Sequence, residues 1–195
     1  MHKSKGNSMD FGEAAESLGV DAMRWVFARH NPAQNLNFGR GTADEGRRRF
    51  LLTLWNTYSF FVTYANIDRF DPQSADGAAP SSEMDRWILS ELHSLVAGVT
   101  KSLDDYDAAD AGRNIEEFVE LLSNWYVRRS RRRFWKSEND QDKLSAHHTL
   151  YTCLVTLAKL LAPLTPFIAE ELYQNLVRSV YADAPESVHL ADYPV

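Results

Sequence analysis

Residues 111–136 read AGRNIEEFVELLSNWYVRRSRRRFWK and predict a long helix with a strongly basic end. With 100° between successive residues, the apolar side chains share one stripe, as they do in a helix that packs against a core. The stripe comprises Ala111, Ile115, Phe118, Leu122, Trp125 and Tyr126. Arg129, Arg133 and Lys136 continue it, whereas Arg128, Arg132 and Trp135 lie to one side. We therefore expect Trp125 and Tyr126 in the core. Beyond them we expect either a projecting helix end or buried carboxylates that meet Arg129 or Arg133.

Apolar residues spaced three and four apart predict further helices around this one. They recur over 50–65, 84–103, 144–161 and 167–176, and the basic helix itself is expected from near Asp107 to Ser137. No segment alternates between apolar and polar residues as a half-buried strand does. The sequence therefore predicts an all-α fold, a bundle of long helices with short connections.

Capping and breaking residues mark the expected helix ends. Thr42 and Glu45 have the spacing of a capping box, which predicts the start of the helix that carries 50–65. Pro163 is expected to end the helix before it, because proline lacks an amide hydrogen. Thr165 followed by a proline is typical of a helix start.

The two ends of the chain differ from its middle. Two short helices are expected between Ser8 and Arg29, divided by Gly19, with Asp21 as the cap of the second. Residues 68–82 are rich in turn-forming residues and predict a loop. Residues 182–195 lack a helical period and are interpreted as a linker toward a further C-terminal region. We divide the chain into 1–41, 42–181 and 182–195.

Composition excludes several classes of protein. The chain has 195 residues, 44% of them hydrophobic, so it can bury a core. The single cysteine, Cys153, excludes an internal disulfide and is expected to be buried. His147 and His148 are expected on a helix surface, and no metal site is predicted. No apolar run is long enough for a membrane span or a signal peptide, so we expect a cytoplasmic protein without a membrane partner.

Charge is distributed unevenly. The formal net charge is −6, but residues 128–136 hold six basic residues and no acid, which leaves −12 on the rest of the chain. Four aromatic residues bracket the arginines: Trp125, Tyr126, Phe134 and Trp135. Arginine binds phosphates and aromatic rings stack on unpaired bases, so this stretch indicates an RNA contact. A solvated helix end, or a helical protein-interaction module that docks an acidic partner, also fits the pattern.

The N-terminal residues resemble a signature of known enzymes. MHKSKGN, residues 1–7, resembles the lysine-rich loop of class I aminoacyl-tRNA synthetases, with Met1, Lys3 and Ser4 in matching places and His2 where the family has serine. In that family the corresponding lysine stabilises charge on the phosphates of ATP. The resemblance therefore assigns a catalytic, ATP-binding role to Lys3.

Further blocks resemble the same family along almost the whole chain. Residues 19–25 resemble its Gly-x-Asp-x-x-Arg helix, and the blocks that favour the isoleucine branch are 54–61, 66–68, 84–90, 123–135 and 161–167. The resemblance implies the helical domain that binds the anticodon stem of an isoleucine tRNA. The same domain of a valine enzyme remains an alternative.

The resemblance also implies which sites of the parent enzyme this chain holds and which it lacks. The parent enzyme would activate isoleucine with ATP and Mg²⁺ and transfer it to tRNA. Its nucleotide-binding, editing and amino-acid sites would precede Met1, so we expect the fragment alone to be inactive, to need no cofactor and to be a monomer. The residues assigned to tRNA binding are Arg128, Arg129, Arg131, Arg132, Arg133, Trp135 and Lys136.

Overall fold

The structure, a computed structural model, describes residues 10–74, 79–136 and 140–195. Its α-helices are α1 (Phe11–Leu18), α2 (Val20–Arg29), α3 (Arg40–Gly46), α4 (Leu52–Asp68), α5 (Glu83–Asp104), α6 (Ala108–Leu121), α7 (Arg128–Lys136), α8 (Asp140–Leu161) and α9 (Pro166–Tyr173). Turns of π-helix occupy Arg47–Leu51, Leu122–Val127 and Gln174–Arg178, and a 3₁₀ turn occupies Val188–Leu190. No strand occurs in the described ranges, and the all-α prediction is confirmed.

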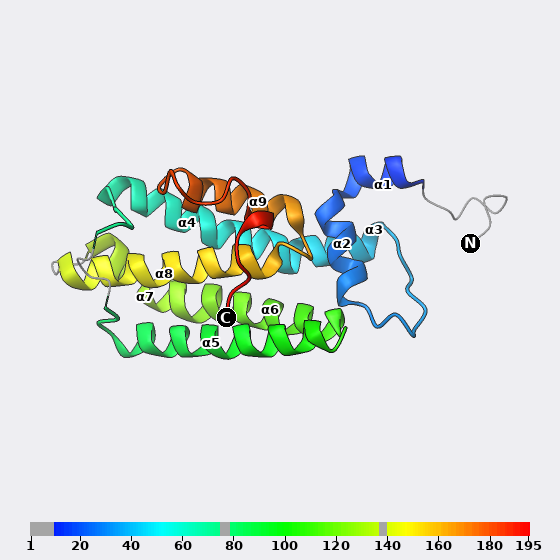
Figure 1. Cartoon of the computed structure of the whole chain (residues 1–195), viewed down its shortest axis with the longest axis horizontal. Coiled ribbons are helices and arrows are strands. Elements are labelled where there is room, and N and C mark those ends of the chain that lie inside the picture. The colour runs from blue at the N-terminus through cyan, green and yellow to red at the C-terminus, as the bar shows by residue number, and fades with distance from the viewer. Residues whose placement is uncertain (1–9, 75–78, 137–139) are drawn as a thin grey trace.

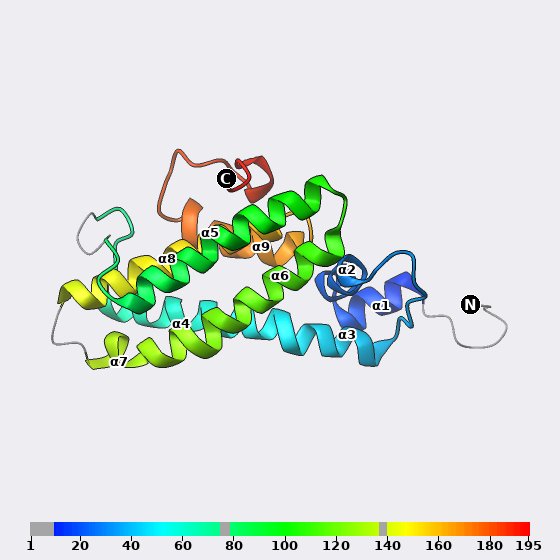
Figure 2. The same ribbon diagram turned by 90° about the horizontal axis from the view of Figure 1, so that it is seen from below.

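Four rods of helix form the bundle. In Figure 1, α4, α5, α8 and the continuous rod of α6 and α7 run along the long axis of the molecule. The view in Figure 2, from below, shows α4 beside the α6–α7 rod and α5 beside α8. Helices α1, α2 and α3 gather at one end, and α7 and the start of α8 lie at the other. The basic helix therefore ends far from the N-terminal helices.

Two apolar clusters hold these parts together. The larger fills the bundle, and the smaller joins the N-terminal helices through Ala14, Leu18, Met23, Val26 and Ala43. Trp25 connects α2 to the bundle, because its side chain is 1% exposed and stacks on the Phe50 ring at a centroid distance of 3.7 Å. Cys153 is buried in the main core, as predicted.

Two predicted caps are wrong, and Thr165 precedes α9 as expected but its hydroxyl does not cap that helix. Helix α3 begins at Arg40, before Thr42, and the Thr42 hydroxyl donates to the Asn37 carbonyl instead of closing a capping box. Asp21 lies inside the first turn of α2, yet its carboxylate accepts hydrogen bonds from amides at the start of α9. A local sequence pattern cannot reveal a cap that serves a helix so distant in the chain.

Other helix boundaries follow the sequence. Gly19 divides α1 from α2, as predicted, with a positive φ of 87° that favours glycine. The loop predicted after α4 ends at Ser82, which forms a capping box with Asp85 at the start of α5. The helix expected from near Asp107 is continuous to Lys136, with a π-turn in its middle.

The C-terminal tail packs against the bundle. We interpreted residues 182–195 as a linker, but Val188 is 3% exposed and its amide donates to the Glu170 carboxylate. The Tyr193 hydroxyl donates to the Leu160 carbonyl at 3.2 Å. These residues therefore belong to the packed body of the molecule. Among the helices of the described residues, none is both long and apolar enough to cross a membrane.

Candidate nucleic-acid interface

The exposed side of α7 carries four arginines. Arg128, Arg129, Arg131 and Arg132 are exposed, and Trp135 beside them is 49% exposed. Within the described part of the chain, none of these four arginines forms an ion pair with a carboxylate. Their positive charge therefore faces solvent.

Aromatic rings lie against two of these arginines. The guanidinium carbon of Arg129 lies 4.5 Å from the centre of the Trp125 ring, and that of Arg131 lies 5.9 Å from the centre of the Phe60 ring. Stacking of this kind orients a guanidinium and leaves its hydrogen-bond donors available. Trp125 is 49% exposed, so its expected place in the core is wrong, whereas Tyr126 is buried as predicted.

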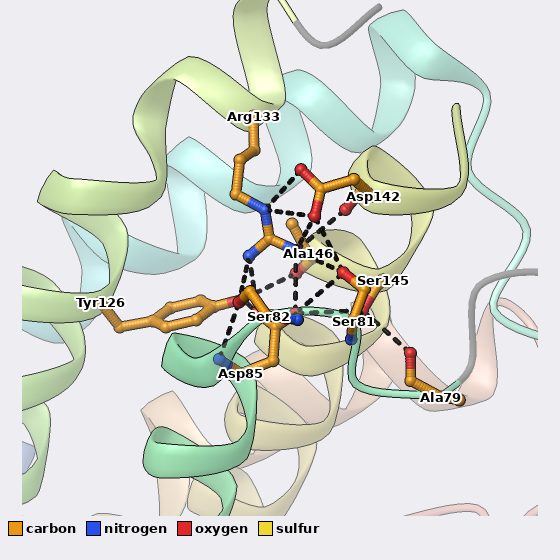
Figure 3. A network of polar contacts seen from close by, with 9 residues as sticks. All are labelled: Ala79, Ser81, Ser82, Asp85, Tyr126, Arg133, Asp142, Ser145 and Ala146. Carbon is orange, nitrogen blue, oxygen red and sulfur yellow. Dashed lines mark hydrogen bonds and ion pairs between the residues drawn. The ribbon is translucent and has the colours of Figure 1, made fainter. Parts of the chain in front are cut away.

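Arg133 points the other way, into the bundle. Its side chain is 15% exposed and forms ion pairs of 2.6 Å with Asp85 and 2.8 Å with Asp142 (Figure 3). The expectation that Arg129 or Arg133 meets buried carboxylates is thus confirmed for Arg133. Its guanidinium also donates to the hydroxyls of Ser81 and Ser82, so it is engaged within the protein.

Asp85 is the centre of this network. It is fully buried and accepts hydrogen bonds from the Tyr126 hydroxyl at 2.8 Å and the Ser145 hydroxyl at 3.1 Å. Burial alone would raise the pKa of the Asp85 carboxyl, but hydrogen bonds from Arg133, Tyr126 and the Ser82 amide, with the charge of Arg133, hold it well below its usual range. Asp85 is therefore ionised at neutral pH.

The network determines where the exposed arginines point. It joins the start of α5, the π-turn before α7, α7 itself and the start of α8, as Figure 3 shows. Removing one partner of such a buried pair costs about 3–5 kcal/mol, because the other charge is left uncompensated. The inward contacts of Arg133 thus hold α7 with Arg128, Arg131 and Arg132 facing out.

A second group of arginines was not predicted from the sequence. Arg47, Arg48 and Arg49 are consecutive and exposed on the π-turn before α4. Arg47 and Arg49 pair with Asp44 and Glu45 on the same rod at 2.8 and 3.2 Å. Such exposed pairs contribute little and leave the cations accessible. The run of three arginines was the signal that could have identified this group.

The two adjacent histidines of α8 are part of the packed interior. His147 and His148 are both buried, so their expected place on a helix surface is wrong. The Asp68 carboxylate contacts His147 Nε2 and Lys143 Nζ, each at 2.9 Å. Burial lowers the pKa of His147 despite this carboxylate. The described residues contain no group of three His, Cys, Asp or Glu side chains that could hold a metal ion.

Some predicted site residues cannot be placed. Met1, His2, Lys3 and Ser4 lie outside the described residues, as does the side chain of Lys136. The catalytic role of Lys3 therefore stays a prediction. Of the residues assigned to tRNA binding, the structure brings Arg128, Arg129, Arg131, Arg132 and Trp135 together on one exposed helix end and turns Arg133 away from it.

Known proteins resemble the chain along its full length. An isoleucine–tRNA ligase of Dehalococcoides mccartyi (strain CBDB1) is 61% identical to it, and one of Thermus thermophilus is 50% identical. Each match covers 100% of this chain and 19% of the relative, so the chain spans about a fifth of the length of these relatives.

A solved structure shares the fold. The LeuRS of Agrobacterium radiobacter K84, in a ternary complex with tRNA and LeuAMS, matches with a TM-score of 0.69 over 100% of this chain and 22% of that one, at 20% identity. The family described as the anticodon-binding domain of tRNA ligase matches residues 85–195, which is more than half of the chain and includes α5 from Asp85 onward and α6 to α9 with the basic α7. The chain therefore belongs to the anticodon-binding domain family of tRNA ligases.

Proposed function

We propose that this chain is the tRNA-binding part of an isoleucine–tRNA ligase and that the exposed side of α7 contacts the anticodon stem. The observation that carries the proposal is the set of arginines on α7 without carboxylate partners among the described residues, beside two half-exposed tryptophans. Guanidinium groups fit phosphate oxygens, and exposed indoles can stack on unpaired bases. The anticodon-binding family of the chain supports RNA as the partner that supplies these phosphates.

The tRNA contact set is narrower than the one expected from sequence. It comprises Arg128, Arg129, Arg131, Arg132 and Trp135, whereas Arg133 positions the helix. Lys136 extends the set by its place in the sequence. Arg48 is a further candidate for a tRNA contact. It precedes the start of α4, and its Nε donates to the Asp44 carbonyl.

The parent activity is part of the proposal. The whole ligase would activate isoleucine with ATP and Mg²⁺, with Lys3 at the phosphates, and transfer the aminoacyl group to tRNA in the cytoplasm. Residues 1–41 would close the catalytic part and 42–181 would form the tRNA-binding bundle, against which 182–195 pack. Isoleucine relatives with 61% and 50% identity favour this specificity over valine. The isolated chain, acting as a monomer, would bind tRNA without charging it.

A salt-dependent titration tests the tRNA interface. Replacing Arg128, Arg131 or Arg132 by alanine should weaken binding of isoleucine tRNA. The slope of log affinity against log salt should fall by up to about 0.7–0.9 for each phosphate that the variant no longer neutralises. The matched control is Arg113→Ala, because Arg113 is also exposed on the same rod but lies near the start of α6.

The outcome distinguishes two classes of partner. If the three variants bind tRNA like the control, with the same salt slope, α7 is not the RNA contact. An acidic protein that binds the wild type, fails to bind the three variants and is not displaced by tRNA would favour a protein-interaction module instead.

A further inference from the structure

The start of α9 lacks a side-chain cap of its own. Thr165 precedes α9, but its hydroxyl is buried without a hydrogen-bond partner and does not cap the helix. Amides at the start of α9 and carbonyl groups in the turn between α8 and α9 thus need partners from elsewhere. This junction lies at the end of the bundle where α2 packs (Figure 1).

Helix α2 supplies the missing partner at the start of α9. The Asp21 carboxylate accepts from the Ile168 amide at 2.7 Å and from the Phe167 amide at 3.4 Å. Burial raises the pKa of the Asp21 carboxyl, although these amides and Arg24 lower it. The two amides thus find an acceptor at Asp21, although burial disfavours its ionised form.

Arg24 binds the turn that joins α8 to α9. Its Nη2 donates to the Pro163 carbonyl at 2.8 Å and its Nε donates to the Leu164 carbonyl at 3.1 Å. Asp21 and Arg24 are three residues apart in a helix, so their side chains share one face. One turn of α2 therefore holds both sides of the junction, about 140 residues away in the sequence.

A neighbouring side of α2 is fixed separately. Arg29 forms an ion pair of 2.6 Å with Glu116 on α6, and Trp25 stacks on Phe50. A helix held along one side only can still rotate about that contact. The two polar contacts to the junction remove this freedom beside a mainly apolar surface hollow that Asp21 and Phe167 line.

We propose that Asp21 and Arg24 form a clamp that fixes the orientation of α1 and α2 on the bundle, and that they are positioning residues for aminoacyl transfer. The second part rests on the proposed function. If the bundle holds the tRNA and the chain before α1 belongs to the catalytic part, this orientation determines where the acceptor end of the tRNA falls. A misplacement of about 1 Å can slow a reaction about 100-fold without weakening binding.

The clamp itself can be tested in the 195-residue protein. Asp21→Ala should increase the hydrogen-exchange rate of the Phe167 and Ile168 amides by about 5-fold or more, the usual effect of losing a helix cap. Asp21→Asn keeps an acceptor and should restore most of the protection. Asp10→Ala is the matched control, because Asp10 caps only α1. Unchanged exchange in Asp21→Ala would refute the clamp.

Activity tests the positioning role in the full-length ligase. Asp21→Ala and Arg24→Ala should each slow aminoacyl transfer about 10-fold or more, with isoleucine-dependent ATP–pyrophosphate exchange and the KM for tRNA nearly unchanged. Asp21→Asn should rescue transfer. If transfer, ATP–pyrophosphate exchange and tRNA binding were all weakened equally, the variants would be generally destabilised and the positioning role would be overturned. An unchanged rate of transfer would also overturn it. If the α7 variants did not affect tRNA binding, the proposed interface would be refuted. The hydrogen-exchange result for Asp21→Ala would still stand, because it does not depend on tRNA.

Discussion

Arg132 and Arg133 are neighbours in the chain with opposite surroundings. Arg132 is exposed, whereas Arg133 is held between Asp85 and Asp142. The basic continuation of the apolar stripe predicted that Arg133 could turn inward. The sequence could not identify Asp85 as its partner, because that carboxylate lies 48 positions earlier and only the packing of α5 on α7 brings them together.

Substitutions at these two arginines should separate stability from binding. Arg133→Ala leaves the buried Asp85 carboxylate without its cation and should lower the free energy of unfolding by about 3–5 kcal/mol. Arg132→Ala removes an exposed side chain and should change it by less than about 0.5 kcal/mol. Urea unfolding of the two variants measures this difference. Equal stabilities would mean that the network around Asp85 does not hold α7.

The same network predicts a loss of stability in acid. The pKa of Asp85 in the folded protein lies below the ordinary value of 3.8, so the unfolded chain binds the proton more readily. The contribution of the ionised carboxylate is therefore complete above about pH 5 and is lost progressively as the pH falls through the lowered pKa of the folded protein. Asp85→Asn should be less stable than the wild type at neutral pH, and the gap should narrow in acid. Urea unfolding at a series of pH values measures the gap, and a gap independent of pH would contradict the assignment.

At the scale of the helices, the apolar periodicity predicted the bundle. It did not predict which side chains are buried within and after the π-turn that precedes α7. In Leu122–Val127 the chain forms hydrogen bonds five residues back, such as that from the Arg128 amide to the Ser123 carbonyl. Such a turn holds about one residue more than α-helix over the same rise. Trp125 and Arg129 are exposed, and the buried positions are Tyr126, Val127, Ser130 and Phe134. A count at 100° per residue could not anticipate this shift.

At the scale of the whole molecule, the two ends of the bundle have different tasks. One end joins α2 to the α8–α9 junction through Asp21 and Arg24, and the other presents the arginines of α7. No local signal in the sequence revealed the first task, since Asp21 has the spacing of an ordinary cap for its own helix. The signal for the second was strong, because basic residues cluster without acids between 128 and 136.

The π-turn before α7 makes one stretch of this chain unusually tolerant of shortening. Because Leu122–Val127 contains about one residue more than an α-helix needs, deletion of the exposed Asn124 should let the segment relax to α-helix while Phe118 and Phe134 keep their faces toward the core. Deletion of the exposed Glu117, in the regular helix before the π-turn, should rotate the side chains between it and the π-turn away from their faces, and it should take the buried Phe118 and Val119 out of the core. Thermal melts should show a cooperative transition for the first deletion and none for the second. If both deletions abolished the transition, the π-turn would not be able to lose its extra residue. An in-frame deletion of one codon would then be as damaging there as anywhere in the bundle.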